Sequence, residues 1–406
     1  MRLLGIPASL SAPERRILLL LGAAFFIGQY DMTLLTLALP DVQESFSIAE
    51  EELGTMIAIA RLGALPAIAL ALLSDGRGRR RLLVVSLVGL SIFSLATSFA
   101  QTANQFIFFQ ANARLFTTLE EILAVVYALE LLPSRHRGWG VGFLAAMGGL
   151  GSGLASLLYG LSDYLPGGWR ALYVIGGLAI MYVAWLRRSL PESPMFEQQQ
   201  PGQVKPVFWQ PLLELFRHHR LALLALTLIA GMFWFQAVAN LNFMSKYLQD
   251  SHGYSPSQVS IMFVVAGTFA IFGNVIAGRT SDRVGRRPVL AFGIALNCAT
   301  FLLFYNTSGW MVPLAWIAAL FSFFVVDVMV NAIAGELFPT HCRSTAATLR
   351  AIISLVAAAA GLAIEGSLYT ALGSHGAALS LMTLSSLLAL PAVLFWLRET
   401  ANIELQ

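Results

Sequence analysis

Charged side chains interrupt several of the long apolar runs in this 406-residue chain. An ionisable group inside a bilayer is costly, so residues of this kind are candidates for function. Deep carboxylates can carry protons, and a deep arginine can bind an anion through its planar fork of donors. The acids in these runs are Asp31, Glu120, Glu121, Asp327 and Glu365, and the bases are Arg61, Arg114 and Arg350.

Helical spacing groups some of these residues. Gln110, Arg114 and Glu121 recur at intervals that place them on one helix face. Glu120 lies about 100° around the same helix. Glu121 and Asp327 each lie nine residues before another acid, so they occupy equivalent depths near the middle of the membrane. Four other charges are placed by helix rise: Asp31 and Arg61 about 12–14 Å below the outer surface, Arg350 about 10 Å from the cytoplasmic end, and Glu365 at the outer interface.

These charges predict a proton-coupled binding site. A carboxylic acid away from water favours its neutral form, and a nearby arginine opposes this. If a substrate occupies the arginine, the acid takes a proton, and the loaded protein carries no unpaired charge. The alternative is a set of static ion pairs that fix helix packing. The predicted proton-coupling residues are Asp31, Glu120, Glu121 and Asp327.

Aromatic and amide side chains provide further candidates for substrate contact. They suit a partly apolar solute that also forms hydrogen bonds. Packing or lipid-facing aromatics are the alternative interpretation. The predicted substrate-binding residues are Tyr30, Arg61, Gln110, Arg114, Trp234, Gln236, Asn240 and Asn331.

The elements that position these residues are predicted to be membrane helices. The chain is 57% hydrophobic and 12% charged, about half the charged fraction of a soluble domain. A membrane helix needs about 20 mostly apolar residues. Twelve runs meet this need, so the fold class is all-α integral membrane. They span about 16–39, 53–73, 82–99, 104–130, 138–160, 169–186, 220–243, 256–277, 288–306, 311–335, 345–370 and 376–397.

The distribution of basic residues predicts the orientation. Twenty of the 25 lysines and arginines lie in the termini or in loops that follow even-numbered runs. Positive loops remain cytoplasmic, so both termini are predicted to be cytoplasmic. The small positive charge reflects this rule and does not indicate a nucleic-acid partner.

The chain also contains an internal repeat. Asp75, Glu130 and Glu192 recur as Asp282, Glu336 and Glu399, at offsets of 207, 206 and 207 residues. The repeat predicts two pseudo-symmetric six-helix bundles, at 1–189 and 220–406, joined by a cytoplasmic linker at 190–219. Two repeats in a membrane protein favour rocking of the bundles about a central site. The repeated charges predict a cytoplasmic latch, comprising Asp75, Arg79, Arg80, Glu130, Arg137, Asp282, Arg286, Arg287, Glu336 and Arg343, with Arg350 closing an inner gate.

The loops resemble a known family. Residues 74–80 (SDGRGRR) and 278–287 (GRTSDRVGRR) are similar to the loop signature of the major facilitator superfamily. Pro191-Glu192-Ser193-Pro194 resembles its sugar-porter and metabolite–proton-symporter branch. The resemblance implies the MFS fold, alternating access and proton coupling by Asp31 after an aromatic residue, here Tyr30. It also matches Glu120 to an acid of organic-solute branches.

The predicted function is therefore proton-coupled uptake of a small organic solute, namely an organic acid, with aromatic acids included. A sugar or polyol carrier, an organic-cation carrier, an exporter and a non-transporting nutrient sensor are the alternatives. No Ser/His/Asp set or His–acid metal cluster occurs at depth, so an enzyme is not predicted. No cofactor is expected, since the proton gradient supplies the energy. The predicted setting is a monomer in the lipid bilayer of a bacterial inner membrane, with protons and a small molecule as partners.

Overall fold

The computed structural model describes residues 10–77, 79–133, 136–188, 190–191, 209–339 and 342–400. The side chains of 72–77, 79, 209–211, 343 and 344 also lie outside the description. Three predicted latch side chains, Asp75, Arg79 and Arg343, are therefore not described. Most of the predicted linker, 192–208, is also outside the described residues.

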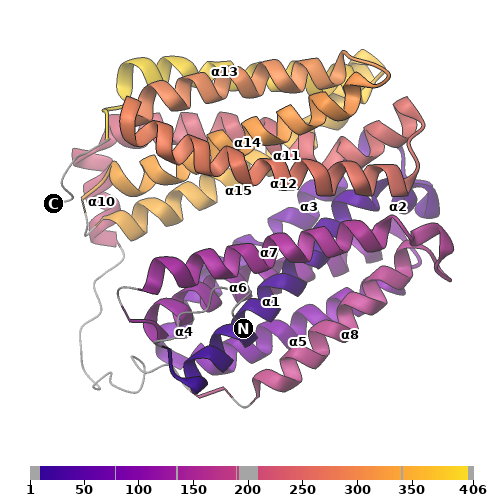
Figure 1. Ribbon diagram of the computed structural model, residues 1–406, viewed down its shortest axis with the longest axis horizontal. Coiled ribbons are helices and arrows are strands. Elements are labelled where there is room, and N and C mark those ends of the chain that lie inside the picture. Colours follow the sequence, from indigo (N-terminus) through magenta and orange to yellow (C-terminus); the bar gives the residue numbers. More distant parts are fainter. Residues whose placement is uncertain are drawn as a thin grey trace. The chain divides into compact units, whose positions relative to one another are not determined.

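Every described element is a helix (Figure 1). This confirms the all-α fold class. The first half contains α1 (Ala12–Leu37), α2 (Leu39–Phe46), α3 (Glu50–Leu62), α4 (Leu65–Arg77), α5 (Arg79–Ser98), α6 (Ala103–Leu131), α7 (Arg137–Tyr159), η3 (Ser162–Tyr164) and α8 (Trp169–Arg187). The second half contains α10 (Trp209–His218), α11 (Arg220–His252), α12 (Pro256–Val284), α13 (Arg286–Tyr305), α14 (Met311–Glu336), α15 (Arg343–Leu372), α16 (His375–Leu384), η4 (Ser385–Ala389) and η5 (Ala392–Trp396).

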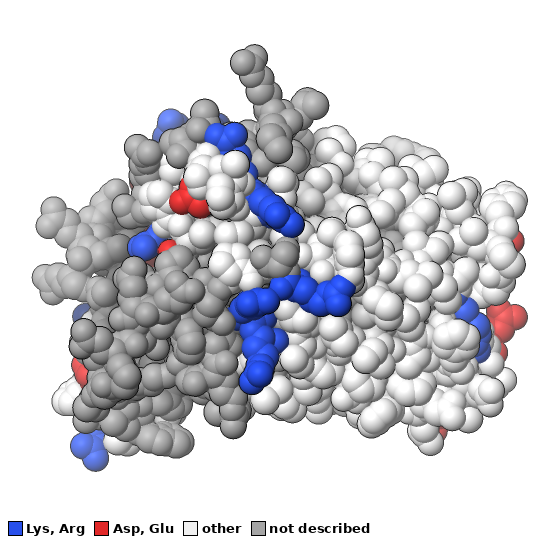
Figure 2. Space-filling model, turned by 90° about the horizontal axis from the view of Figure 1, so that it is seen from below, with Lys and Arg blue, Asp and Glu red and all other residues white. Residues whose placement is uncertain are grey.

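Eleven of the described spans are long and apolar enough to cross a membrane. The long helix α6 completes the predicted twelve; its 29 residues include Arg114, Glu120 and Glu121, which interrupt its apolar sequence. On the face drawn in Figure 2, Lys and Arg side chains gather left of the centre, and a broad area to their right is largely uncharged. A short amphipathic helix, α10, precedes α11.

Local sequence explains where helices begin and end. Ser11 caps α1 and Ser255 caps α12, each in a reciprocal box with the side chain three residues on. Glycines end two of the longest helices: Gly253 follows α11 and Gly373 follows α15, with φ of 66° and 73°. Such left-handed conformations favour glycine, which has no Cβ to clash.

The second membrane run is broken, which the sequence did not predict. α3 ends at Leu62 and α4 begins at Leu65. A Cβ on Gly63 would lie only 2.0 Å from the carbonyl oxygen of Ala111, so the break allows α6 to approach the backbone closely. Pro66 in the first turn of α4 suits the restart, because proline lacks the N–H that this position leaves unpaired.

The two halves repeat one helix contact. A Cβ on Gly151 of α7 would lie 1.8 Å from the Phe26 carbonyl oxygen of α1. A Cβ on Gly361 of α15 would lie 1.8 Å from the Phe235 carbonyl oxygen of α11. Small residues allow membrane helices to pack this closely. The equivalent positions are 209 and 210 residues apart, close to the offset of the sequence repeat.

The chain divides into two compact units. The first comprises Met1–Phe46 with Ile59–Gln203, and the second Ser47–Ala58 with Val204–Gln406. The first nine residues of α3 therefore belong to the second unit, while its last residues belong to the first. The bundle boundaries predicted from sequence stay a prediction.

Candidate functional site

Asp31 lies on α1 inside the first unit, and its side chain is only 3% exposed. Ser94 of α5 donates its hydroxyl to Asp31 Oδ1 at 2.5 Å. The preceding residue, Tyr30, donates its hydroxyl to the Leu172 carbonyl of α8 at 3.0 Å. Its ring lies where a Cβ on Gly176 would clash. Tyr30 thus fixes α1 against α8 beside the buried carboxyl group.

Three more charged residues gather near Asp31, from α3 and α6. Arg114 interacts electrostatically with both Asp31 and Glu121. Arg61 interacts electrostatically with Arg114 and Glu121. Gln29, two residues before Asp31, donates its amide to Glu121 Oε1 at 2.5 Å. We call Asp31, Arg61, Arg114 and Glu121 the ionic site. The structure thus brings together four of the residues singled out from sequence.

The two arginines of the ionic site have N–H donors that are not used in hydrogen bonds. Its two acids and two bases balance in formal charge. Each acid has its own neutral donor, Ser94 or Gln29. Among the described residues neither arginine has a hydrogen bond or direct ion pair, and Arg61 Nε is buried without a partner. Because an unpaired buried donor is costly, an acceptor on a ligand would find these guanidinium groups available.

Glu120, although adjacent to Glu121, points elsewhere. Its Oε1 lies 2.5 Å from Nη1 of Arg187 on α8, and its Oε2 accepts from Ser86 of α5 at 2.8 Å. Glu120 is 1% exposed and Arg187 is 0% exposed. The guanidinium also donates to the Leu20 carbonyl of α1. This pair ties four helices together outside the ionic site. Arg187 was missed from sequence because the predicted apolar run ends at residue 186, whereas α8 continues to Arg187.

Gln110 was predicted to share the face of Arg114. It donates instead to Thr97 of α5 at 3.1 Å and is 4% exposed. The structure therefore places Gln110 in the helix packing and outside the ionic site.

The second unit holds a smaller charged group. Asp327 on α14 interacts electrostatically with Arg350 on α15. Asn331, one turn further along α14, donates to Asp327 Oδ1 at 3.1 Å and is exposed. Arg350, predicted at the inner gate, is thus placed beside an acid of its own unit.

A neutral network occupies the interior of the second unit. Asn240 donates to Gln236 at 2.5 Å and to Thr383 at 3.0 Å, and Gln236 donates to Asn297 at 3.1 Å. Asn297 continues to Ser322 at 3.2 Å. We call these five residues the amide network. It joins α11, α13, α14 and α16. Asn297, Ser322 and Thr383 were missed from sequence because they lie in three different apolar runs, so no helical spacing connects them with Gln236 or Asn240.

Trp234 lies near this network on α11. Its ring meets Phe323 edge to face, with centroids 6.0 Å apart. Its Nε1 is buried and has no hydrogen-bond partner. An indole N–H usually finds a partner when buried, so Trp234 retains a donor that a ligand could use.

The repeated cytoplasmic charges meet in the second unit. Arg286 contacts Asp282 at 2.7 Å and Glu336 at 3.0 Å, and its backbone N–H donates to Glu399 at 2.7 Å. The Arg287 N–H donates to Glu399 at 3.2 Å. In the first unit Arg80 donates to the carbonyl of Arg188, and Arg137 to that of Leu132. The contacts of the second copy form a lattice of the kind that the sequence predicted for a latch.

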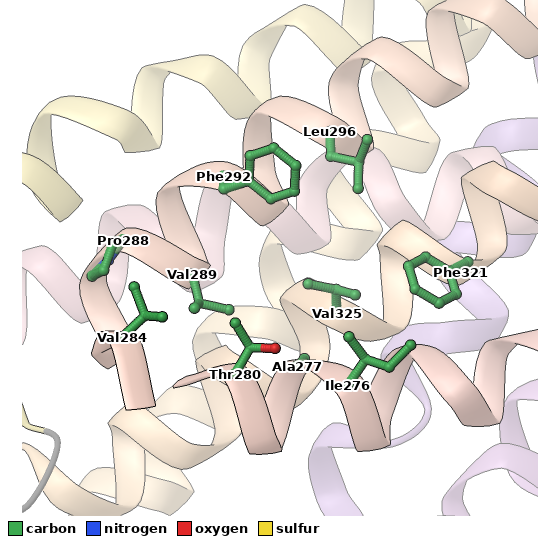
Figure 3. Close-up of a pocket in the computed structure, with 10 residues that line it drawn as sticks. All are labelled: Ile276, Ala277, Thr280, Val284, Pro288, Val289, Phe292, Leu296, Phe321 and Val325. Carbon is green, nitrogen blue, oxygen red and sulfur yellow. The ribbon is translucent and has the colours of Figure 1, made fainter. Parts of the chain in front are cut away.

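An apolar groove of about 270 Å³ lies between α12, α13 and α14 (Figure 3). Its walls include Ile276, Phe292, Phe321 and Val325, and Thr280 is the one lining residue with a polar side chain. The groove offers no charged group, so its chemistry differs from that of the ionic site.

A helical membrane fold with charged groups buried among its helices is typical of proteins that move solutes or ions across membranes. The model of the Major Facilitator Superfamily matches residues 21–247 and 237–405, so the chain belongs to this superfamily. Its members are transporters and not enzymes.

Individual relatives carry more specific names. The chain is 26% identical to a probable 4-methylmuconolactone transporter of Cupriavidus pinatubonensis over 79% of this chain and 75% of the relative. It is 27% identical to the cis,cis-muconate transport protein of Acinetobacter baylyi over 80% of each. The crystal structure of a D-xylose–proton symporter has a TM-score of 0.78 at 17% identity, with 96% of this chain and 99% of that chain covered. This last likeness concerns the fold alone.

Proposed function

We propose that this protein takes up a small organic acid together with protons, by alternating access. The observation that carries the proposal is the pair of arginines, Arg61 and Arg114, which lie near two carboxylates and have no direct partner among the described residues. A ligand carboxylate matches the fork geometry of a guanidinium. Muconate and 4-methylmuconolactone, named for two relatives, are both carboxylic acids, which supports the same class.

The charge balance suggests how protons enter the cycle. Asp31 and Glu121 offset Arg61 and Arg114 in the empty ionic site. A bound monocarboxylate adds one negative charge, and crossing a bilayer with a net charge is costly. One proton on Asp31 restores neutrality, since Ser94 can remain its hydrogen-bond partner. We therefore infer one proton for each carboxylate group of the substrate.

The other candidate residues have supporting roles in this proposal. Glu120 stabilises the first unit through Arg187, and Gln236 and Asn240 stabilise the second through the amide network. Trp234 is the residue of the second unit that we assign to substrate contact. The lattice around Arg286 latches the cytoplasmic side. Both termini are proposed to be cytoplasmic, in a bacterial inner membrane, with one chain sufficient for transport.

Proteoliposomes with an internal pH dye test the proposal. Muconate, benzoate, xylose and a quaternary amine are added singly, with no imposed gradient, and the internal pH is recorded. Acidification by the carboxylates alone is the expected result. Acidification by xylose or the amine would contradict the substrate class. Exchange of labelled muconate without any pH change would contradict proton coupling.

A further inference from the structure

His375, the first residue of α16, lies between two carboxylates in the second unit. Its Nδ1 is 2.6 Å from Glu365 Oε1 on α15, and its Nε2 is 2.8 Å from Glu50 Oε2 on α3. An ionised carboxylate only accepts hydrogen bonds, and only the protonated imidazole donates from both nitrogens. A neutral ring would direct a lone pair at one carboxylate. The geometry therefore matches a ring that carries an extra proton.

Two aromatic rings lie against the same imidazole. The Tyr369 ring is stacked on it with centroids 4.4 Å apart, and the Phe243 ring lies 4.9 Å away. An aromatic face attracts a cation, and the attraction is stronger away from water. This environment also favours the charged ring.

The charges around the ring are closer to balance when His375 is protonated. Glu365 is fully buried, and the side chain of Lys246 on α11 is 3% exposed. Lys246 Nζ lies 3.1 Å from Glu50 and 2.5 Å from Asp250, whose side chain is 48% exposed. With a neutral ring, Glu50 and Glu365 face Lys246 alone. A protonated ring supplies the second positive charge.

The remaining titratable neighbours are tyrosines and His252, whose ring meets that of Tyr247 with centroids 5.1 Å apart. Tyr305 of α13 interacts electrostatically with Glu365 and with Tyr247 of α11. The Tyr247 hydroxyl donates to the Tyr305 carbonyl at 3.0 Å. Glu365 Oε2 is buried and has no hydrogen-bond partner. Neither phenol supplies a charge in the imidazole range, between about pH 5 and 8, and His375 is the imidazole that contacts both carboxylates.

Glycines allow α3 to reach this cluster. A Cβ on Gly54 of α3 would lie 2.0 Å from the Leu362 carbonyl oxygen of α15. A Cβ on Gly366 of α15 would lie 2.0 Å from the Glu51 carbonyl oxygen of α3. Any larger residue at either position is incompatible with this contact. The first part of α3, Glu50–Ala58, is thus docked on α15 by two backbone approaches and by the ionic contacts of Glu50.

We propose that Glu50, His375 and Glu365 form a proton-binding site, distinct from the ionic site, whose occupancy docks Glu50–Ala58 onto α15. Undocking removes Glu50 from the ring and admits water to Glu365, so the docked state binds the proton more tightly. Lower pH therefore favours docking, by at most about tenfold in the docked-to-undocked ratio per pH unit for one proton. The remainder of α3 belongs to the first unit. We therefore assign docking to a step of the transport cycle, and this assignment alone rests on the proposed function.

Pulsed electron paramagnetic resonance tests docking without any substrate. Spin labels at T55C and L372C, both exposed positions of the second unit, report the distance between α3 and α15. The buried native cysteines are replaced by serine. The full chain in lipid nanodiscs is measured from about pH 5 to about pH 8, the range of imidazole titration. We expect a short, narrow distance whose population falls as the pH rises.

Variants separate the parts of this proposal. H375Q should remove the pH dependence, and H375R should keep the short distance at all pH values. G54A should abolish the short distance, whereas G267A, a helical glycine with open space around it, should not. An unchanged population across the pH range, or an H375Q titration like that of the parent, would overturn the proposal. Loss of transport with intact pH-dependent docking would count against the transport function alone.

Discussion

The two units share a helical plan but differ in the chemistry of their interiors. The first buries Asp31 among the charged groups of the ionic site, beside a second buried ion pair, Glu120 and Arg187. The second fills the equivalent space with the neutral amide network around Gln236 and Asn240. Its charges form three other groups: Asp327 with Arg350, the lattice at Arg286 and the cluster at His375.

This difference suggests that the two units took on different roles after the duplication. Glycine contacts fix the plan in both halves, because Gly151 and Gly361 allow equivalent helices to meet at the backbone. Plan and chemistry are thus encoded by different residues. A neutral interior can pack helices without binding a proton, whereas a charged one responds to protons and anions. We therefore expect substitutions in the ionic site to change coupling, and those in the amide network to change stability.

Of the variants that test this comparison, Asp31→Asn should have the largest effect, a loss of gradient-driven accumulation. The variant keeps the size of the side chain but cannot carry the coupling proton. Gradient-driven accumulation should be lost, while exchange of labelled muconate across the membrane continues. One coupled proton is worth about tenfold accumulation per pH unit of gradient. Uptake into proteoliposomes with and without an imposed gradient measures both quantities.

Asp327→Asn is the matched control from the second unit. It should retain accumulation, because its carboxylate lies outside the ionic site. Equal losses of accumulation in the two variants would contradict the proposal that the two units have different roles. Intact accumulation in Asp31→Asn would leave that residue with a packing role.

Glu120→Gln should have the next largest effect, on stability. Removing one partner of a buried pair leaves the other charge uncompensated, at a cost of about 3–5 kcal/mol. Both cysteines are buried, so a thiol-reactive fluorophore reports unfolding of the detergent-solubilised protein on heating. The double variant with Glu120 and Arg187 both changed to Leu should recover much of the loss. A stable Glu120→Gln that no longer accumulates substrate would restore Glu120 to proton coupling, as the sequence predicted.

The fold was predictable from the sequence because its signals are local and repeated. Apolar runs, basic loops and duplicated motifs gave the helices, and the family match confirmed the superfamily. The partners of buried groups were less accessible. Glu120 and Glu121 are neighbours in sequence, yet one helical step sends Glu120 toward Arg187 and Glu121 toward Gln29. Which face of a helix meets which neighbour depends on packing. The spacing within one apolar run does not show that Asn297 meets Gln236 of another run.

Arg114→Lys should weaken binding of an anionic substrate. Lysine keeps the charge but loses the planar fork, and a hydrogen bond to a charged group is worth roughly 1.5–3 kcal/mol. We expect the dissociation constant for muconate to rise by about tenfold or more, as measured by calorimetry in detergent. Arg350→Lys, in the second unit, is the control and should leave it unchanged. The same constant in both variants and the parent would remove Arg114 from the binding site.

The smallest expected effect comes from Asp41→Asn at the end of the first unit. Burial raises the pKa of Asp41, and the nearby acids Asp163 and Glu44 raise it further. The hydrogen bond that Asp41 accepts from the Tyr159 hydroxyl at 3.0 Å lowers it. Because the folded state holds this proton more tightly than the unfolded state, stability falls as the pH rises from about 4, the ordinary value for aspartate, through the raised pKa. Asparagine has no proton to lose in this pH range, so the variant does not show that fall in stability.

The variant should therefore match the parent near pH 4 and exceed it slightly at neutral pH, on the order of 0.5 kcal/mol. The thiol-reactive melt at the two pH values measures the difference. Asp163→Asn should give a smaller gain in the same direction, because Asp163 is exposed and acts only through its charge. These acids crowd one another, whereas Glu50 and Glu365 of the second unit share Lys246 and His375. A loss of stability in Asp41→Asn at neutral pH would mean that the hydrogen bond from Tyr159 outweighs burial and repulsion. The first unit would then stabilise the charged form of Asp41, as the second unit stabilises the charged forms of Glu50 and Glu365.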